Sequence, residues 1–261
     1  MAEGARSNGN GAGAGFEAAQ TGTSIFDPVL CEIVYTWFSP PRGRILDPFA
    51  GGSVRGIVAA YLGRKYTGVD LRPEQIKANE AQARAIVPGN LPAWLEGDSR
   101  EAIPAGKFDL VFSCPPYYDL EVYSEDPRDL STCPKYSDFL EAYRAIILQS
   151  LDRLKADRFA CFVVSNIRDA KGIYRNLVAD TVAAFDAGGA RLYNDAVLLT
   201  AVGSLPIRVG RQFAMSRKLG KTHQNVLVFI KGDPHKAAAA CGPVEIAFEP
   251  EAAAAEIGGG V

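Results

Sequence analysis

Apolar positions along the chain follow two spacings in turn, one typical of helices and the other of buried strands. The first half predicts helices at 27–38, 53–63 and 73–86, alternating with strands at 43–47, 66–70, 93–97 and 108–113. The second half predicts helices at 136–154 and 173–185 and strands at 158–165, 193–202 and 225–230. No helix is expected between the last two strands. This order predicts an α/β fold with a Rossmann-like, seven-stranded, mostly parallel sheet that has one antiparallel strand.

Three of the predicted strands lead into an acidic residue, and the carboxyl ends of parallel strands meet at one edge of a sheet. Asp47 precedes a glycine-rich turn that lets backbone approach a ligand closely, and its charge suits an amine-bearing ligand better than a phosphate. Asp70 follows 23 residues later, where a carboxylate can accept from ribose hydroxyls. A lone strand-end Asp is usually a helix cap, but Asp98 makes a third. Together they outline a cofactor crevice.

The strand at 108–113 runs directly into Cys114-Pro115-Pro116-Tyr117. Each proline fixes its φ near −65° and lacks an N–H, so the Cys114 and Pro115 carbonyls are held in set directions. Tyr117 then places a flat, polar-tipped ring at the mouth of the sheet. A fixed carbonyl beside an aromatic ring suits a planar ligand that carries an amine. A Pro-Pro turn with a packed tyrosine would be the ordinary alternative, and the crevice upstream decides against it.

With both motifs in place, the chain resembles the DNA methyltransferases that modify adenine N6 or cytosine N4, in the manner of small phage or prophage DNA methylases. Asp47-Pro48-Phe49-Ala50-Gly51 is similar to their cofactor motif and Cys114–Tyr117 to their catalytic motif, over about residues 25–232. The resemblance implies a class I methyltransferase fold, S-adenosylmethionine as cofactor, double-stranded DNA as partner and a role in DNA methylation, including restriction-modification. The catalytic residues implied are Cys114, Pro115, Pro116 and Tyr117. The cofactor-binding residues are Asp47, Phe49, Ala50, Gly51, Gly52, Asp70, Asp98 and Ser113.

Two positions depart from the family pattern. Ser53 stands at the second glycine position, while Gly52 sits one residue earlier. Cys114 stands where the family carries Asp, Asn or Ser, and a thiol is a weak acceptor for the target amine. Ser113 is adjacent, but strand alternation points it to the other face. Adenine is preferred over cytosine as the target, and the choice stays open.

A basic segment lies at 203–222, in the connection between the last two strands. Its cations are Arg208, Arg211, Arg217, Lys218 and Lys221, and no acid occurs from 207 to 222. Because the whole chain has a net charge of −2, this is a local enrichment suited to DNA phosphates. A solvated loop is the alternative. The acidic loop at 118–135 is instead expected to act as a mobile lid.

Composition favours one domain at 23–234 between a Gly/Ala-rich tail at 1–22 and an Ala/Gly-rich tail at 235–261. The five cysteines show no metal or disulfide spacing, so neither a metal nor a disulfide is expected. With no signal peptide and no apolar run near ~18 residues, a cytoplasmic protein without a membrane span is expected.

Three other functions stay open at this point. Cys114 could be a nucleophile for cytosine-C5 methylation, although in that family the cysteine follows a proline and does not precede two. The same fold also serves RNA or protein amine methyltransferases. A non-catalytic DNA- or cofactor-binding protein is the third, opposed by the intact Asp47, Asp70, Asp98 and Tyr117. Nothing in the sequence sets the oligomeric state.

Overall fold

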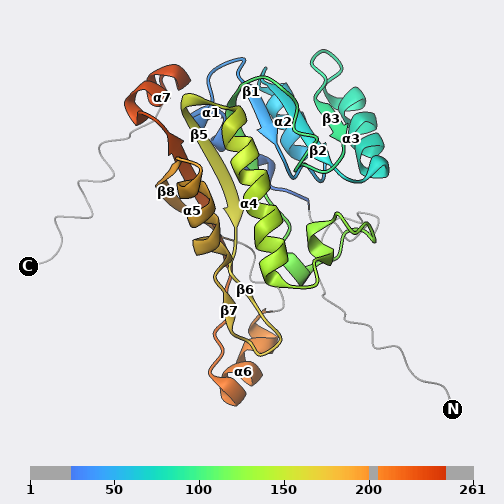
Figure 1. Ribbon diagram of the computed structural model, residues 1–261, viewed down its shortest axis with the longest axis vertical. Helices are drawn as coiled ribbons and strands as arrows, with labels where there is room; N and C mark the ends of the chain where they lie inside the picture. Colours follow the sequence, from blue (N-terminus) through green and yellow to red (C-terminus); the bar gives the residue numbers. More distant parts are fainter. Residues whose placement is uncertain (1–24, 200–204, 245–261) are drawn as a thin grey trace, which may run out of the picture.

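One seven-stranded sheet organises the chain, and the computed structural model describes it through residues 25–199 and 205–244 (Figure 1). The strand order is β3-β2-β1-β4-β5-β9-β8. Neighbouring strands pair in parallel except at β9, which is antiparallel to both β5 and β8. The strands are β1 (Arg44–Asp47), β2 (Lys65–Asp70), β3 (Ala93–Glu96), β4 (Phe108–Ser113), β5 (Leu154–Val164), β8 (Arg191–Leu199) and β9 (His223–Lys231). The predicted sheet with one antiparallel strand is confirmed.

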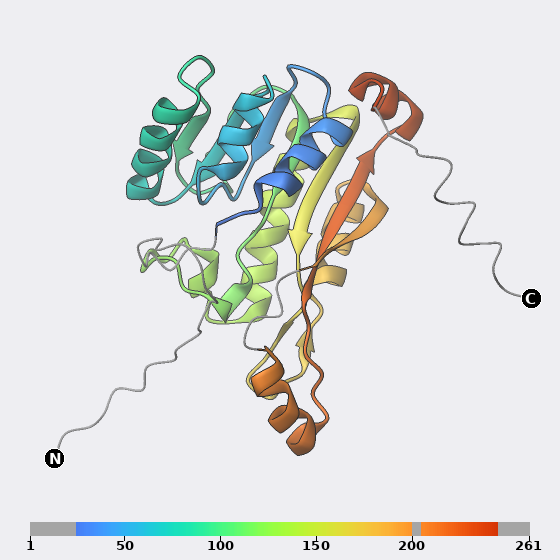
Figure 2. The same ribbon diagram turned by 180° about the vertical axis from the view of Figure 1, so that it is seen from behind.

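Helices cover both faces of this sheet (Figures 1 and 2). One face carries α1 (Pro28–Phe38), α2 (Val54–Tyr61), α3 (Pro73–Ile86) and α7 (Pro234–Cys241). The other carries α4 (Tyr136–Arg153) and α5 (Leu177–Ala187). The sheet therefore has a separate apolar core on each side.

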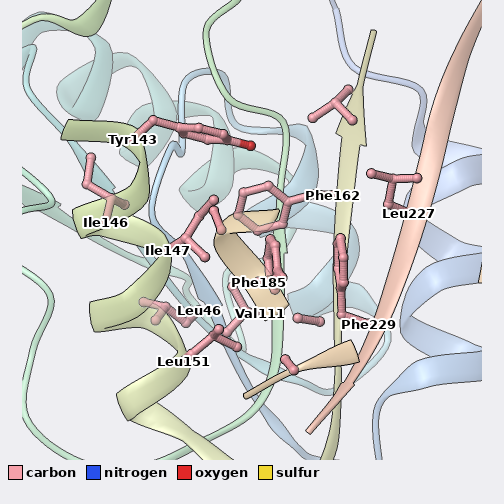
Figure 3. Packing of buried hydrophobic residues seen from close by; sticks show 14 of the residues in the cluster. Leu46, Val111, Tyr143, Ile146, Ile147, Leu151, Phe162, Phe185, Leu227 and Phe229 are labelled. Atoms are coloured by element: carbon pink, nitrogen blue, oxygen red, sulfur yellow. The ribbon is translucent and has the colours of Figure 1, made fainter. Parts of the chain in front are cut away.

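The two cores follow from the period-2 geometry of the strands. Along β5, Cys161 packs into the core under α1 and α2, while Phe162 packs into the core under α4 and α5. In the second core the rings of Phe185 and Phe229 stack in parallel with their centroids 3.8 Å apart (Figure 3). Because both faces of the central strands are buried, they contain continuous apolar runs, such as 110–112 in β4 and 159–164 in β5, in place of an alternating pattern.

A helix, α7, follows the C-terminal boundary predicted at residue 234 and packs on the sheet. Asp233 caps this helix by accepting from the N–H groups of His235 and Lys236, and Pro234 occupies its first position. Ala237 and Cys241 are buried against the sheet. The apolar face of this alanine-rich helix is small, so the sequence pattern gave little sign of it. The predicted tails at 1–22 and beyond 244 lie outside the described residues.

The connection between β8 and β9 also differs from its prediction. A helix, α6 (Leu205–Ser216), replaces the expected loop over most of 203–222. Leu205, Val209 and Phe213 recur every four residues, which is a helical spacing. The basic residues and Gly210 obscured that pattern.

The helix predicted at 173–185 begins four residues later, at Leu177. The residues before it form a two-stranded ribbon, β6 (Ile167–Arg168) paired antiparallel with β7 (Tyr174–Arg175). Its turn is closed by Asp169, whose carboxylate accepts from Ile173 N at 2.9 Å, and by Gly172 at φ +85°. Turn chemistry therefore outweighed the apolar spacing.

Two features are absent from the described part of the chain. Within 25–199 and 205–244, no helix has both the length and the apolar character needed to cross a bilayer. The same residues contain no cluster of three or more His, Cys, Asp or Glu side chains that could hold a metal ion.

Candidate active site

The predicted site residues gather at the carboxyl ends of four adjacent strands. Chain order runs outward from β1 to β2 and β3, then returns to place β4 on the other side of β1. Such a reversal leaves a crevice at the strand ends, where α/β sheets bind ligands. Asp47 at the end of β1 and Ser113 at the end of β4 meet there, with Ser113 Oγ donating to Asp47 Oδ1 at 2.5 Å.

Asp47 is completely buried, and its carboxylate has protein partners on both oxygens. Oδ2 accepts from Arg55 Nε at 2.6 Å and from the Tyr66 hydroxyl at 2.7 Å. Oδ1 accepts from Ser113 and, at 3.2 Å, from Phe49 N. The structure thus shows this carboxylate holding the turn that follows it. Its predicted contact with the cofactor stays a prediction.

Arg55, at the start of α2, is a site residue that the sequence analysis missed. Its Nη2 donates to Phe49 O at 2.7 Å and Ala50 O at 2.9 Å, so one guanidinium bridges Asp47 and the two residues before the glycines. Burial lowers the pKa of Arg55, but the nearby Asp47 carboxylate raises it above its ordinary value overall. The available signal was an arginine inside an otherwise apolar helical stretch.

The glycine turn is fixed by hydrogen bonds to its backbone and has open space where the side chains of Gly51 and Gly52 would be. Asp70 Oδ2 accepts from Gly51 N at 2.9 Å, and Asn79 Nδ2 on α3 donates to Gly51 O at 2.7 Å. Gly51 adopts φ +50°, and a Cβ placed on Gly51 or Gly52 would meet no atom within 4 Å. This open space is a cradle for a ligand that approaches the backbone. Asn79 was not predicted. The available signal was its position three residues after Ile76, on the buried face of the helix.

Asp70 is the most accessible of the carboxylates around the glycine turn. Its side chain is 12% exposed, while Asp47 is 0% exposed. Its Oδ1 accepts from Arg72 N at 2.9 Å. Burial raises the pKa of Asp70 above its ordinary value, and the hydrogen bonds from Arg72 and Gly51 offset only part of that rise.

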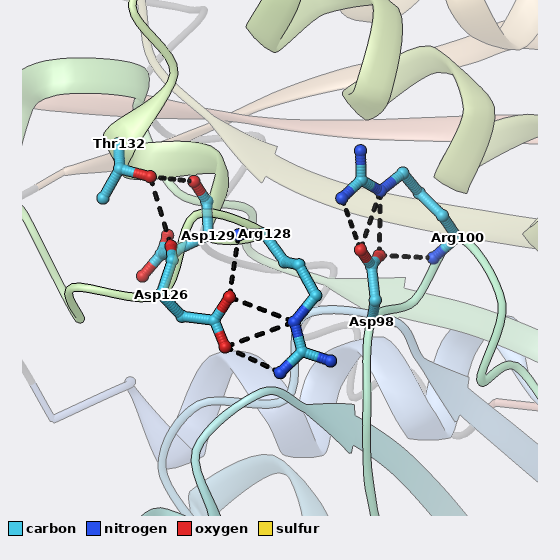
Figure 4. A network of polar contacts seen from close by, with 6 residues as sticks. All are labelled: Asp98, Arg100, Asp126, Arg128, Asp129 and Thr132. Atoms are coloured by element: carbon cyan, nitrogen blue, oxygen red, sulfur yellow. Dashed lines mark hydrogen bonds and ion pairs between the residues drawn. The ribbon is translucent and has the colours of Figure 1, made fainter.

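Asp98 borders a cavity of about 570 Å³ beyond the end of β3. Its carboxylate pairs with Arg100 at 2.5 Å (Figure 4). Burial raises the pKa of Asp98, but the hydrogen bonds from Arg100 bring it below its ordinary value. The cavity is lined by Gly97, Asp98, Arg100, Glu101, Ala102 and Arg128.

The predicted catalytic loop brings Tyr117 against two strands. Gln224 Nε2, in β9, donates to the Tyr117 hydroxyl at 2.8 Å, and that hydroxyl donates to Val163 O in β5 at 3.4 Å. Cys114 Sγ lies 3.9 Å from the same oxygen. The ring is therefore fixed at its polar end by residues far away in sequence. Gln224 gave no recognisable signal in the sequence.

The environment of Cys114 does not favour a nucleophile. Burial raises the pKa of its thiol above the ordinary value of 9.0, against the opposing charge of Arg55. The thiolate, which is the nucleophilic form, is therefore scarce at neutral pH. Burial likewise raises the pKa of Tyr117, so its phenol stays neutral.

The expected lid at 118–135 is folded onto the end of α4 by two short 3₁₀ helices, Tyr118–Leu120 and Leu130–Thr132 (Figure 1). Tyr118 takes φ +51°, which is costly for an aromatic residue and turns the chain sharply after Tyr117. Asp126 pairs with Arg128 at 2.7 Å (Figure 4), and Arg128 reaches the Asp98 cavity. The segment thus reaches the cavity beyond the carboxyl end of β3. Its mobility stays a prediction.

The basic residues predicted to bind DNA divide into groups. Arg217, Lys218 and Lys221 line one groove next to the β6–β7 ribbon. Arg211 is exposed on α6, outside the lining of that groove. Arg208 also belongs to α6, but its side chain lies outside the described part of the chain.

Sequence comparison finds short matches to methyltransferases, and no family model matches the chain. Ribosomal protein L11 methyltransferase of Thermus thermophilus is 39% identical over 71 residues, 27% of this chain and 27% of its own length. Ribosomal RNA small subunit methyltransferase C of Pasteurella multocida is 32% identical over 89 residues, 33% of this chain and 26% of its own length. Each match spans about a quarter of the relative.

Structure comparison finds the same fold over most of the chain. TrmN from Thermus thermophilus has a TM-score of 0.52 at 16% identity, covering 78% of this chain and 48% of its own. A SAM-dependent methyltransferase from Methanosarcina mazei also has a TM-score of 0.52, at 15% identity, covering 77% and 97%. Magnesium protoporphyrin IX methyltransferase from Synechocystis, solved with bound S-adenosylhomocysteine, has 0.50 at 13% identity, covering 78% and 81%. The fold is that of the class I SAM-dependent methyltransferases.

Proposed function

We propose that this chain transfers a methyl group from S-adenosylmethionine to the exocyclic amine of a base in duplex DNA, with adenine N6 preferred over cytosine N4. The observation that carries the proposal is the placement of the Pro-Pro-Tyr loop beside the glycine turn, at the reversal in strand order. A planar amine held by this loop would face a ligand held by that turn. The buried Asp47–Ser113 contact ties the two parts together.

The residues around the glycine turn fit the cofactor. The backbone of Gly51 and Gly52 supplies the open cradle, next to the predicted cofactor residues Phe49 and Ala50, and Asp70 has exposed carboxylate surface for ribose hydroxyls. Asp98 stands farther along the same edge of the sheet, where it pairs with Arg100 and borders a cavity whose lining does not include the glycine turn. When bound, S-adenosylmethionine supplies an electrophilic sulfonium methyl group. Asp47, buried under the turn, acts through Arg55 and Phe49.

The chain's own contribution to the reaction is positional. The target base leaves the duplex, because its amine cannot be reached inside the stack. Tyr117 stacks on the base, and the Pro115 carbonyl accepts from its amine, with Cys114 as a weak second acceptor. Holding the nitrogen in one place supplies the rate gain of proximity and orientation. No covalent nucleophile is needed, which agrees with the protonated thiol of Cys114.

RNA is the second candidate substrate, and a specific observation favours it. One of the relatives that match by sequence is named as a ribosomal RNA methyltransferase. The stacking and amine contacts proposed for Tyr117 and Pro115 apply equally to a single-stranded RNA base, which needs no extrusion from a duplex.

Transfer of radiolabelled methyl from S-adenosylmethionine to duplex DNA, single-stranded DNA and RNA tests the proposal. Incorporation into duplex DNA is expected, above that into RNA of the same sequence. Incorporation into RNA alone would replace the first candidate with the second. A protein that binds the cofactor but labels none of the three polymers would contradict both and favour a non-catalytic role.

Replacing Cys114 by serine is expected to keep or raise the rate of methyl transfer. A hydroxyl is nearly isosteric with the thiol and accepts hydrogen bonds better. Single-turnover assays of the Cys114→Ser variant measure this effect. If Cys114 were a covalent nucleophile, the variant would be inactive, and DNA containing 5-fluorocytosine would trap the wild-type protein.

As the pH decreases, the affinity for the cofactor is expected to begin to fall at a higher pH than it would if Asp70 had the ordinary aspartate pKa. The raised pKa of Asp70 means that its ionised, accepting form is lost above the ordinary aspartate value of 3.8. Calorimetric titration of S-adenosylmethionine from neutral to acidic pH measures the fall. An Asp70→Asn variant should bind about 1–3 kcal/mol more weakly at neutral pH and lose most of the pH dependence. An identical pH profile in that variant would remove Asp70 from the cofactor site.

A further inference from the structure

A second hollow lies between the β6–β7 ribbon and the segment joining α6 to β9. Figures 1 and 2 show these two segments side by side, beyond the carboxyl ends of the parallel strands. It has a volume of about 670 Å³. Residues in 166–174 form one wall and residues in 216–223 form the other. The ribbon wall was not predicted from the sequence, because a helix was expected to begin at residue 173.

The lining of this groove is strongly cationic. Its basic side chains are Arg168, Lys171, Arg217, Lys218 and Lys221, and its lining contains no Asp or Glu among the residues that the structure describes. The chain as a whole has a net charge of −2, so the groove concentrates positive charge against the overall balance. Five cations around one hollow repel one another, and an anionic ligand relieves that repulsion.

The two walls meet at the turn of the ribbon. A Cβ placed on Gly172 would lie 2.9 Å from Lys218 Nζ, so the ammonium of Lys218 sits against the ribbon backbone. Arg168 Nη1 donates to Gly172 O at 2.7 Å, and its guanidinium lies 3.8 Å from the centre of the Tyr174 ring. These contacts organise the turn and leave Lys171, at its tip, exposed.

The groove is connected to the catalytic tyrosine through both of its walls. Asn166 in the ribbon wall follows Val163 by three residues, and Val163 accepts from the Tyr117 hydroxyl. His223 in the other wall is adjacent to Gln224, which donates to the same hydroxyl. A ligand in the groove is therefore held by the segments that hold the Tyr117 ring.

We propose that this groove binds the phosphodiester backbone of the nucleic acid next to the target nucleotide, with Lys171 and Lys218 contacting phosphates from opposite walls. The inference rests on the proposed function, and it assigns the β6–β7 ribbon as part of the nucleic-acid interface. A repeating anion of one charge per nucleotide matches a groove whose cations are spread over both walls. The contacts position the strand and carry no base specificity.

The test measures binding of fluorescently labelled duplex DNA and RNA as a function of salt concentration. Lys171→Gln and Lys218→Gln are each expected to weaken binding several-fold and to reduce the slope of log K against log salt by ~0.9 on duplex DNA. The double variant should show about twice the reduction in slope. Lys65→Gln is the matched control, because Lys65 is exposed at the amino end of β2, away from the groove. Its slope should equal that of the wild type.

Cofactor affinity is measured in every variant and should stay unchanged, which separates lost phosphate contacts from misfolding. A Lys171→Gln protein that keeps the wild-type salt slope would overturn the groove proposal, even if the wild type methylates DNA. A wild-type protein that binds cofactor but binds neither polymer in a salt-dependent way would instead contradict the proposed function. A larger loss on RNA than on DNA would keep the groove and move the substrate to RNA.

Discussion

Substitution of Tyr117 by alanine is expected to lower kcat/KM for methyl transfer by about 10²-fold or more. Base stacking on an aromatic ring contributes ~1–3 kcal/mol, and loss of alignment of the amine adds to that loss. The ring is fixed at its hydroxyl by Gln224 and Val163, so its plane is set before any base arrives. Steady-state kinetics on DNA, with cofactor binding by calorimetry, measure the effect.

A Tyr117→Phe variant is the matched control for that experiment. It keeps the stacking surface and removes only the hydroxyl contacts, which are worth about 1 kcal/mol each at most. Two such contacts correspond to roughly thirtyfold at most, so this variant should lose less activity than the alanine variant. Equal activity of the alanine variant and the wild type would exclude Tyr117 as the platform for the base.

The largest loss of stability is expected from Arg55→Ala. The variant would leave the Asp47 carboxylate, which is 0% exposed, without its cationic partner. Breaking a buried ion pair by removing one member costs ~3–5 kcal/mol. Phe49 O and Ala50 O would lose their donor as well, so cofactor affinity should fall with stability. Urea denaturation measures the first effect and calorimetry the second.

Arg84→Ala provides the comparison for Arg55→Ala. Arg84 pairs with Glu80 one helical turn away at 2.8 Å, with side chains 64% and 41% exposed. An exposed pair at this spacing contributes about 0.3–0.5 kcal/mol. If Arg55→Ala destabilised the protein no more than Arg84→Ala, then the network around Asp47 would not hold the glycine turn.

The sheet and the strand-end residues could be predicted because short-range signals determine them. The apolar run at 108–113 and the Pro-Pro-Tyr sequence after it are local, and β4 ends at Ser113 as expected. Parallel order then places Asp47, Asp70 and Ser113 along one edge by topology alone. The α/β character and the antiparallel strand follow from these patterns.

What the sequence missed depends on contacts between distant residues. Gln224 bonds to Tyr117 across 107 positions, and no periodicity encodes that pairing. Asp47 was expected to face the ligand because it ends a strand. Its carboxylate is instead buried in an ion pair with Arg55. The ribbon was missed because Tyr174 and Arg175 pair with a segment that is itself only two residues long. Such short strands exist through tertiary contact, not through intrinsic propensity.

The most direct test of the central claim is the chemical position of the transferred methyl group. Nucleic acid treated with the protein and deuterium-labelled S-adenosylmethionine is digested to nucleosides, which are then identified by tandem mass spectrometry. The account predicts label on an exocyclic amine, as N6-methyladenine or N4-methylcytosine, and its loss in Tyr117→Ala. Label on cytosine C5, or on a protein side chain with none on a base, would contradict it.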